Sequence, residues 1–319
     1  MNGALRAFSK LRPKLPAKMF GRRAVLPAAA LLLAAPPLLF FTGQDFYLDL
    51  LTRALILAIA ALSLNLLVGC GGMVSLGHAA YIGIGAYSVG IPAHYGVHDG
   101  ALHLALAVSL SAAFAFLTGA VCLRTRGLYF ILITLAFSQM LYFTLVSIDA
   151  YGADDGLVIT RRSSFPGLQL EHALVLYYCV FAALALFLFG MRRLMHARFG
   201  RVLLGCRHNR ARMRALGFDA YRHQLACYVL SGAVCGVAGF FLGNFTDFVS
   251  PAMLDWTRSA ELLFMVIIGG AGALFGPLVG AAVFLVLAEL LSGITLHWHL
   301  LFGALLIALV LRGQLFTRG

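Results

Sequence analysis

Few residues of this sequence could do chemistry, and most of them are neutral. His78 follows Ser75 beside a glycine-rich break, where its ring could move a proton or hydrogen-bond across packed helices, and both readings are open. GxSxG, HExxH and P-loop GxxxxGK motifs are absent from the sequence, and no span holds paired carboxylates. The three lysines all lie in the N-terminal tail, at Lys10, Lys14 and Lys18. The sequence therefore favours neither a membrane-embedded enzyme nor ATP binding by this chain.

Seven polar residues within apolar stretches are candidates to line a passage for a solute. They are Asn65, Ser75, His78, Thr134, Ser138, Gln139 and Glu289. Thr134 and Ser138 are four residues apart and so share a helix face. The same groups could instead join packed helices through hydrogen bonds worth about 0.6 kcal/mol each. Glu289 has the stronger functional reading because a carboxylate in lipid is costly. No span holds a charge pair to grip a zwitterion, which favours a weak, gated passage.

The elements that must position these residues are membrane helices. Residues 62–90 contain no charged side chain, and the whole chain is 61% hydrophobic and 11% charged, with a mean hydropathy of +0.92. So few polar groups cannot cover a globular surface in water. The small residues that continue from Gly83 to Gly90 would let helix backbones approach closely in lipid. We therefore predict an all-α, polytopic membrane protein whose packed centre is this stretch.

Uncharged apolar runs of roughly 17 to 25 residues predict about ten transmembrane helices. They cover 25–42, 50–70, 74–96, 101–123, 127–148, 172–191, 224–245, 260–275, 278–292 and 297–311. Helix-packing turns are expected at Gly69, Gly71, Gly72, Gly77, Gly269, Gly270, Gly272, Gly276 and Pro277. The stretch 269–277 could join two spans or lie within one bent or re-entrant element.

The charges orient these spans. With the N-terminus inside, twenty of the 24 Lys and Arg residues fall on the cytoplasmic side, and ten of the 12 acids fall outside. We therefore expect a basic cytoplasmic tail at 1–23, a membrane domain at 24–319 and both termini in the cytoplasm. The run 25–42 is expected to be a retained span rather than a signal peptide. The six cysteines form no CxxC pair and are expected to be packing residues, with no metal site.

Two loops are long enough to act. The outer loop 149–171 contains the turn-forming sequence YGADDGL. The inner loop 192–222 carries nine arginines, and its apolar residues fall near one helical face. This basic amphipathic segment could lie on anionic lipid or dock a cytoplasmic partner.

Four segments carry a family resemblance. They are LSLNLLVGCGGMVSLGHAAYIGIGAY (62–87), FGRVLLGCRHNRARMRALGFDAYRHQLACYVLSG (199–232), VSP (249–251) and MVIIGGAGALFGPLVGAA (265–282), and YGADDGL agrees as well. Together they resemble the permeases of branched-chain amino-acid ABC transporters, of the LivM type, over roughly residues 50–312. The resemblance implies a type II importer-like permease in the bacterial inner membrane, with leucine, isoleucine or valine as cargo. Urea, short amides or aromatic acids are alternative cargoes, and a secondary transporter, a channel or a membrane anchor are alternative functions.

The resemblance also implies partners. These are a homologous LivH-type permease, two cytoplasmic ATP-binding subunits, a periplasmic solute-binding protein and membrane lipid. ATP would be bound by the partners, and this chain is expected to carry no cofactor and to bind no nucleic acid. Residues 192–222 become the cytoplasmic coupling segment, with Phe199, Gly200, Arg201, Leu203, Arg207, Arg210, Met213, Leu216 and Gly217 as the ATPase contacts. Relatives often carry acids where this chain has Arg207 to Arg210, so its ATPase contact is expected to be unusually basic, or shared with lipid.

Overall fold

The computed structural model describes residues 32–34, 36–37, 44–295, 297 and 299–304, and this part of the chain is mostly helical. The predicted tail 1–23 and parts of the predicted spans 25–42 and 297–311 lie outside the described residues. The main helices are α3 (Asp45–Asn65), α4 (His78–His94), α5 (Gly100–Cys122), α6 (Leu128–Val146), α7 (Ala173–His196), α8 (Arg198–His208), α9 (Arg210–Ala215), α10 (Ala220–Thr246), α11 (Trp256–Gly269) and α12 (Gly276–Ser292).

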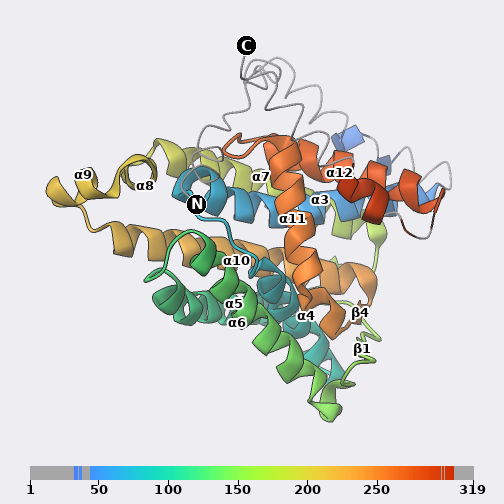
Figure 1. Ribbon diagram of the computed structural model, residues 1–319. Coiled ribbons are helices and arrows are strands. Elements are labelled where there is room, and N and C mark those ends of the chain that lie inside the picture. The colour runs from blue at the N-terminus through green and yellow to red at the C-terminus, as the bar shows by residue number, and fades with distance from the viewer. Residues whose placement is uncertain (1–31, 35, 38–43, 296, 298, 305–319) are drawn as a thin grey trace.

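In Figure 1, α10 lies between an upper group of helices, α3, α7 and α12, and a lower group, α4, α5 and α6. α10 makes its most extensive contacts with α4 and α5, and α3 packs against α10, α12 and α7. In α10, 61% of the residues in the most apolar stretch are buried, and in the continuous helix Asp45–Gly71 the share is 83%. The corresponding shares in α5, α6 and α7 are only 28%, 17% and 28%. Such large apolar surfaces facing outward are typical of helices in contact with lipid. Five helices of the described part are long and apolar enough to cross a membrane.

α4 and α10 touch through their backbones. A methyl group placed on Gly85 would fall 2.0 Å from the carbonyl oxygen of Gly236, and one on Gly239 would fall 2.1 Å from that of Ile82. Helices in lipid approach this closely only where small residues meet. The prediction of a packed centre built on the small residues after position 82 is therefore confirmed.

The predicted glycine break separates α3 from α4. α3 continues into a π-helical turn, η1 (Leu66–Gly71), and the chain leaves it at Gly72, whose φ is +66°. A non-helical connector then leads to His78, the first residue of α4. α3 begins five residues earlier than predicted. Its first turn holds Asp45, and a carboxylate there interacts favourably with the helix dipole.

α11 and α12 form a tight antiparallel hairpin. A methyl group on Gly280 would fall 1.9 Å from the Met265 carbonyl oxygen, and one on Gly269 would fall 1.9 Å from that of Gly276. α11 has 14 residues, which at 1.5 Å each reach about 21 Å, less than a hydrocarbon core of roughly 30 Å. Figure 1 shows α11 running across α3 and α10 rather than beside them. Residues 269–277 were expected either to join two spans or to lie within one bent or re-entrant element. In the structure they form a turn between α11 and α12, and α11 is too short to span the membrane alone.

The outer loop is ordered by short β pairs and one ion pair. After the 3-10 turn η2 (Asp149–Tyr151), β1 (Leu157–Val158) pairs antiparallel with β4 (Phe248–Val249), and β2 (Ser164–Phe165) pairs with β3 (Leu168–Gln169). A second 3-10 turn, η3 (Pro251–Leu254), leads to α11. Arg162 binds both carboxylate oxygens of Asp247 at 2.7 Å, and this contact raises the pKa of Arg162. The loop is thereby fastened to the end of α10.

Candidate functional site

His78 joins three helices at the start of α4. The Ser231 hydroxyl donates to the carbonyl oxygen of Ser63 at 2.6 Å, so it accepts from Nε2 of His78 at 2.9 Å. This fixes the proton on Nε2 and leaves Nδ1 as an acceptor that has no partner within the described residues. The ring is fully buried and packs edge-on against Tyr81. Its observed role is to connect α4, α10 and α3.

Ser75 and Thr134 hold the connector before α4. The Ser75 hydroxyl accepts from the amide of Gly77 at 3.1 Å, and the Thr134 hydroxyl accepts from the amide of Leu76 at 3.3 Å. Thr134 also donates to the carbonyl of Ile131 within α6. Both side chains are at most 1% exposed. These hydrogen bonds satisfy amides that the break in the helix leaves free.

Ser138 and Ser259 secure neighbouring backbone. The Ser138 hydroxyl donates to the carbonyl of Leu254 in η3 at 3.3 Å, and the Ser259 hydroxyl accepts from the amide of Ala79 at 2.8 Å. The sequence reasoning did not single out Ser259 or Ser231. A lone serine in an apolar run gives no signal of its partner, which here lies about 150 to 180 residues away.

Asn65 acts on the turn between α11 and α12. Its amide nitrogen donates to the carbonyl of Ala273 at 2.9 Å, and its amide oxygen accepts from the backbone nitrogen of Gly272 at 2.7 Å. Gly69, one turn further on, meets Gly272 so closely that a methyl group there would fall 2.6 Å from its Cα. Asn65 is fully buried and pairs with the turn as a backbone strand would. The structure thus has a close turn at Gly272, with Asn65 as its partner.

The other two candidates for a passage are placed differently. Gln139 is half-buried on α6, and its amide nitrogen has no hydrogen-bond partner within the described residues. Glu289 is exposed on α12. Four of the seven residues, Asn65, His78, Thr134 and Ser138, are therefore buried and bonded to other elements. Ser75 is buried and bonds within its own connector, the Gln139 amide nitrogen has no partner within the described residues, and Glu289 is exposed. Passage lining stays a prediction for all seven.

The inner loop folds into two helices, of which α8 packs against α7, η1 and α10, whereas α9 projects from the bundle (Figure 1). Asn209 separates α8 from α9, and its side chain caps α9 by accepting from the amide of Arg212 at 2.9 Å. Gly200 lies against the backbone of the α7 end, where a methyl group would fall 2.4 Å from the Leu194 carbonyl oxygen. Gly217, with φ of +84°, ends the segment before α10.

The predicted coupling residues differ in their exposure. Gly200 and Leu203 face inward and are buried, Phe199, Arg210 and Met213 are half-buried, and Arg201, Arg207, Leu216 and Gly217 are exposed. Phe199 stacks on His223, with ring centroids 5.7 Å apart. Leu216 is 65% exposed and Phe218, which the prediction omitted, is 41% exposed. α9 and the residues after it therefore expose arginines and two large apolar side chains.

Arg207 links this segment to the helix break. Its guanidinium donates to the carbonyl of Gly69 in η1, and its side-chain carbons pack on Gly72. Carbonyl groups at a helix C-terminus lack partners within the helix, and a cation there is stabilised by the helix dipole. α8 is thereby bonded to η1, which follows Asn65 directly in the chain.

The described residues contain no cluster of His, Cys, Asp and Glu that could hold a metal ion. All six cysteines are free thiols, and five of them are buried. Cys206 on α8 belongs to the small apolar cluster that includes Val202 and Ala220, and its burial raises the pKa of its thiol. These cysteines pack as small apolar residues, as predicted.

Comparisons with known proteins place the whole helical region in one family. A family model described as "Branched-chain amino acid transport system / permease component" matches residues 46–311. Two relatives, from Salmonella typhimurium strain LT2 and Escherichia coli strain K12, are both called high-affinity branched-chain amino acid transport system permease protein LivM. Each is 26% identical to this chain, over 94% of this chain and 75% of the relative. No solved structure matches the chain significantly.

Proposed function

Because this chain belongs to the branched-chain amino acid transport system permease family, we propose that it is the membrane-spanning subunit of a binding-protein-dependent ABC importer. The proposed cargo is leucine, isoleucine or valine, and the membrane is the bacterial inner membrane. Two cytoplasmic subunits would hydrolyse ATP, a periplasmic protein would select the solute, and a homologous LivH-type permease would complete the passage. The names of both relatives support this cargo.

We also propose about ten helices within the membrane in a type II importer-like arrangement, with both termini inside; α11 is counted among them although its 14 residues are too few to cross alone. Five helices of the described part have the required length, and α4 and α12, with 17 residues each, are near the limit. The distribution of charges supports the orientation: the arginine-rich α8 and α9 lie at one end of α10, and the loop bearing Asp247 lies at the other.

The main support for the proposal is that the segment formed by α8, α9 and the residues up to Phe218 has one exposed side and one side bonded to the helix bundle. On the outer side, Leu216, Phe218 and Arg212 are exposed and free to contact a partner. On the inner side, Arg207 binds the Gly69 carbonyl, next to the turn that Asn65 holds. We propose that the ATPase binds the outer side and that its movement reaches the bundle through Arg207. A coupling element needs a surface that binds the ATPase and a contact that transmits movement to the membrane helices. The exposed residues and the contact of Arg207 with Gly69 would supply these.

The test uses the complete transporter, assembled from this chain and the permease, ATPase and binding-protein subunits of its own genome. Phe218→Glu is expected to lower co-purification of the ATPase about tenfold or more, because it puts a charge in the centre of an apolar contact. Phe248→Glu is the matched control: Phe248 is 37% exposed, but it lies in β4 at the opposite end. ATP-driven leucine uptake into proteoliposomes is expected to fall with ATPase binding.

Two results would reject parts of this proposal. Full assembly and uptake with Phe218→Glu would remove the docking surface from α9 and its flank. Leucine uptake that persists without the ATPase subunits would favour a secondary transporter or channel. Uptake of urea, short amides or aromatic acids in place of leucine would keep the importer and change its cargo.

A further inference from the structure

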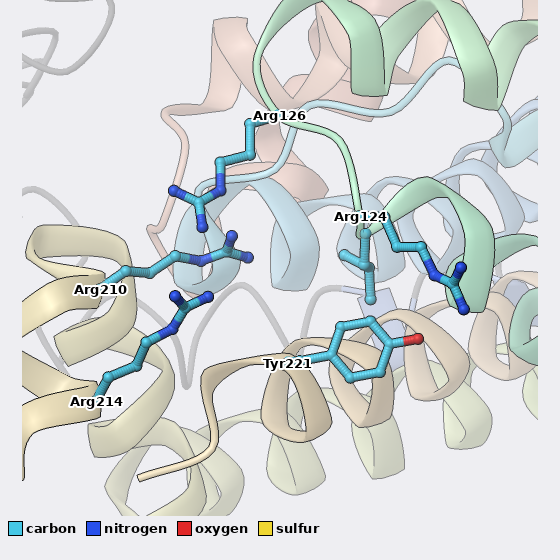
Figure 2. Close-up of a pocket in the computed structure, with 6 residues that line it drawn as sticks. Arg124, Arg126, Arg210, Arg214 and Tyr221 are labelled. Carbon is cyan, nitrogen blue, oxygen red and sulfur yellow. The ribbon is translucent and has the colours of Figure 1, made fainter. Parts of the chain in front are cut away.

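A basic pocket lies where the α5–α6 loop meets α9 and the start of α10. Its volume is about 170 Å³, and its lining consists of Leu123, Arg124, Arg126, Arg210, Arg214 and Tyr221. Figure 2 shows the guanidinium groups of Arg126, Arg210 and Arg214 pointing toward one another, whereas that of Arg124 lies beyond the Tyr221 ring. We call the space between these three guanidinium groups the arginine pocket. It is distinct from the contact of Arg207 with Gly69.

The arginine pocket has an excess of positive charge. The ion pairs within the described residues engage Arg161, Arg162, Arg222 and Arg258, and none engages an arginine of the pocket. Asp219, the acid next in sequence, pairs with Arg222 and caps α10. Burial lowers the pKa of Arg210, and the charges of Arg126 and Arg214 lower it further. Arginine nevertheless stays protonated at neutral pH, so an anion between the three side chains would relieve their repulsion.

The surroundings of the arginine pocket favour a lipid as the source of that anion. On α5, Leu117 and Val121 are 66% and 50% exposed and lie on one face, one turn apart. On α6, Leu128 and Leu132 are 62% and 52% exposed and share a face in the same way. Both surfaces lie on the helix turns next to the α5–α6 loop, which bears Arg126. In the orientation proposed above, this loop lies at the cytoplasmic edge of the membrane. An acyl chain on this surface would bring its headgroup to the pocket.

We propose that the arginine pocket binds the phosphodiester of an anionic phospholipid from the inner leaflet. Guanidinium groups bind phosphate oxygens with two parallel hydrogen bonds, and basic pockets between membrane helices suit acidic headgroups. Tyr221 shapes the wall rather than binding, because its hydroxyl donates to the carbonyl of Ala120 at 3.1 Å. The headgroup would join the α5–α6 loop to α9. On the function proposed above, it would thus hold the coupling segment against the bundle.

Carboxylates of the ATPase are the competing occupant. The three guanidinium groups line the pocket together with the α5–α6 loop and the start of α10, whereas Arg212 of α9 and the following Leu216 and Phe218 are exposed and do not line it. A partner docked on these exposed residues would leave the arginine pocket to the membrane. The geometry therefore separates a lipid-binding side of α9 from a protein-binding side.

The test is native mass spectrometry of the purified full chain in detergent, titrated with phosphatidylglycerol. Phosphatidylcholine with the same acyl chains tests the charge, and soluble glycerol phosphate tests whether the phosphate alone is enough. We expect retention of phosphatidylglycerol in preference to both. Arg126→Gln, Arg210→Gln and Arg214→Gln are each expected to weaken it about fivefold.

Arg222→Gln is the matched control, since it removes the same charge beside Tyr221 but from an exposed side chain paired with Asp219. It is expected to leave retention unchanged. The triple Arg→Lys variant keeps the charge and should keep most of the binding, which guards against misfolding as the cause of a loss. Equal retention by the wild type and the triple Gln variant would overturn the proposal, and so would displacement of the lipid by ATPase cross-linked at Arg210. Neither readout depends on transport, so failure here and failure of the importer assignment are distinguishable.

Discussion

Replacing Asn65 by leucine separates a packing residue from a residue of the solute path. The side chain is fully buried and makes two hydrogen bonds, at 2.9 and 2.7 Å, to backbone atoms of the turn between α11 and α12. Leucine has the same branched arrangement of side-chain heavy atoms but forms neither bond, so the amide of Gly272 and the carbonyl of Ala273 lose their partner. Hydrogen bonds between membrane helices average about 0.6 kcal/mol, and those in soluble proteins reach about 1.5 kcal/mol. Two of them predict a loss of about 1 to 3 kcal/mol.

The loss is measurable as a shift in the unfolding temperature. At roughly 2 °C per kcal/mol for a chain of this size, Asn65→Leu is expected to lower Tm by about 2 to 6 °C. Five of the six cysteines are buried, so a thiol-reactive dye reports unfolding during a thermal ramp. Thr144→Val is the control, because the Thr144 hydroxyl is exposed and bonds only the Met140 carbonyl of its own helix. An unchanged Tm for Asn65→Leu together with lost leucine uptake would refute the packing argument and favour the path.

Two further predictions concern a close contact and an exposed acid. Gly85→Ala is expected to reduce the yield of folded protein several-fold in size-exclusion profiles, because its methyl group would fall 2.0 Å from the Gly236 carbonyl oxygen; Gly190→Ala, with no atom within 4 Å of its new methyl group, should match the wild type. Glu289→Cys in the assembled transporter should react with a charged maleimide if α12 lines a watery passage, whereas Leu117→Cys on the lipid-facing side of α5 should not. Equal protection of both thiols would contradict a passage along α12.

Much of the helical layout was predictable because lipid imposes a length on apolar segments. The expected spans 101–123 and 127–148 correspond to α5 and α6 within two residues at each end. The break before α4 was predictable as well, since Gly72 adopts a positive φ that other residues rarely take. α11 was not: its sequence is as apolar as that of a span, and its crosswise course depends on packing against helices that are distant in the chain.

The partners of the polar residues were beyond the sequence for a related reason. Spacing showed that Thr134 and Ser138 share a face, but it could not show that this face meets Leu76 and η3. The arginine pocket was equally hidden, because Arg126 and Arg210 are 84 positions apart and converge only in the folded chain. The periodicity of a sequence shows which residues share one face of a helix. It does not show which other elements contact that face, and a site is formed by several elements together.

The π-helical turn η1 (Leu66–Gly71) is wider than an α-helical turn and can change its winding. Each of its backbone hydrogen bonds spans one residue more than in an α-helix, so a change to α geometry would rotate the end of the turn, where the connector begins, by about 100°. Two contacts from other elements hold this region. The α11–α12 turn is bonded to Asn65, which precedes η1, and Arg207 is bonded to Gly69 within it. A displacement of either contact residue would change the winding of this turn and therefore the direction in which the connector leads to His78. No helix would have to slide along its axis.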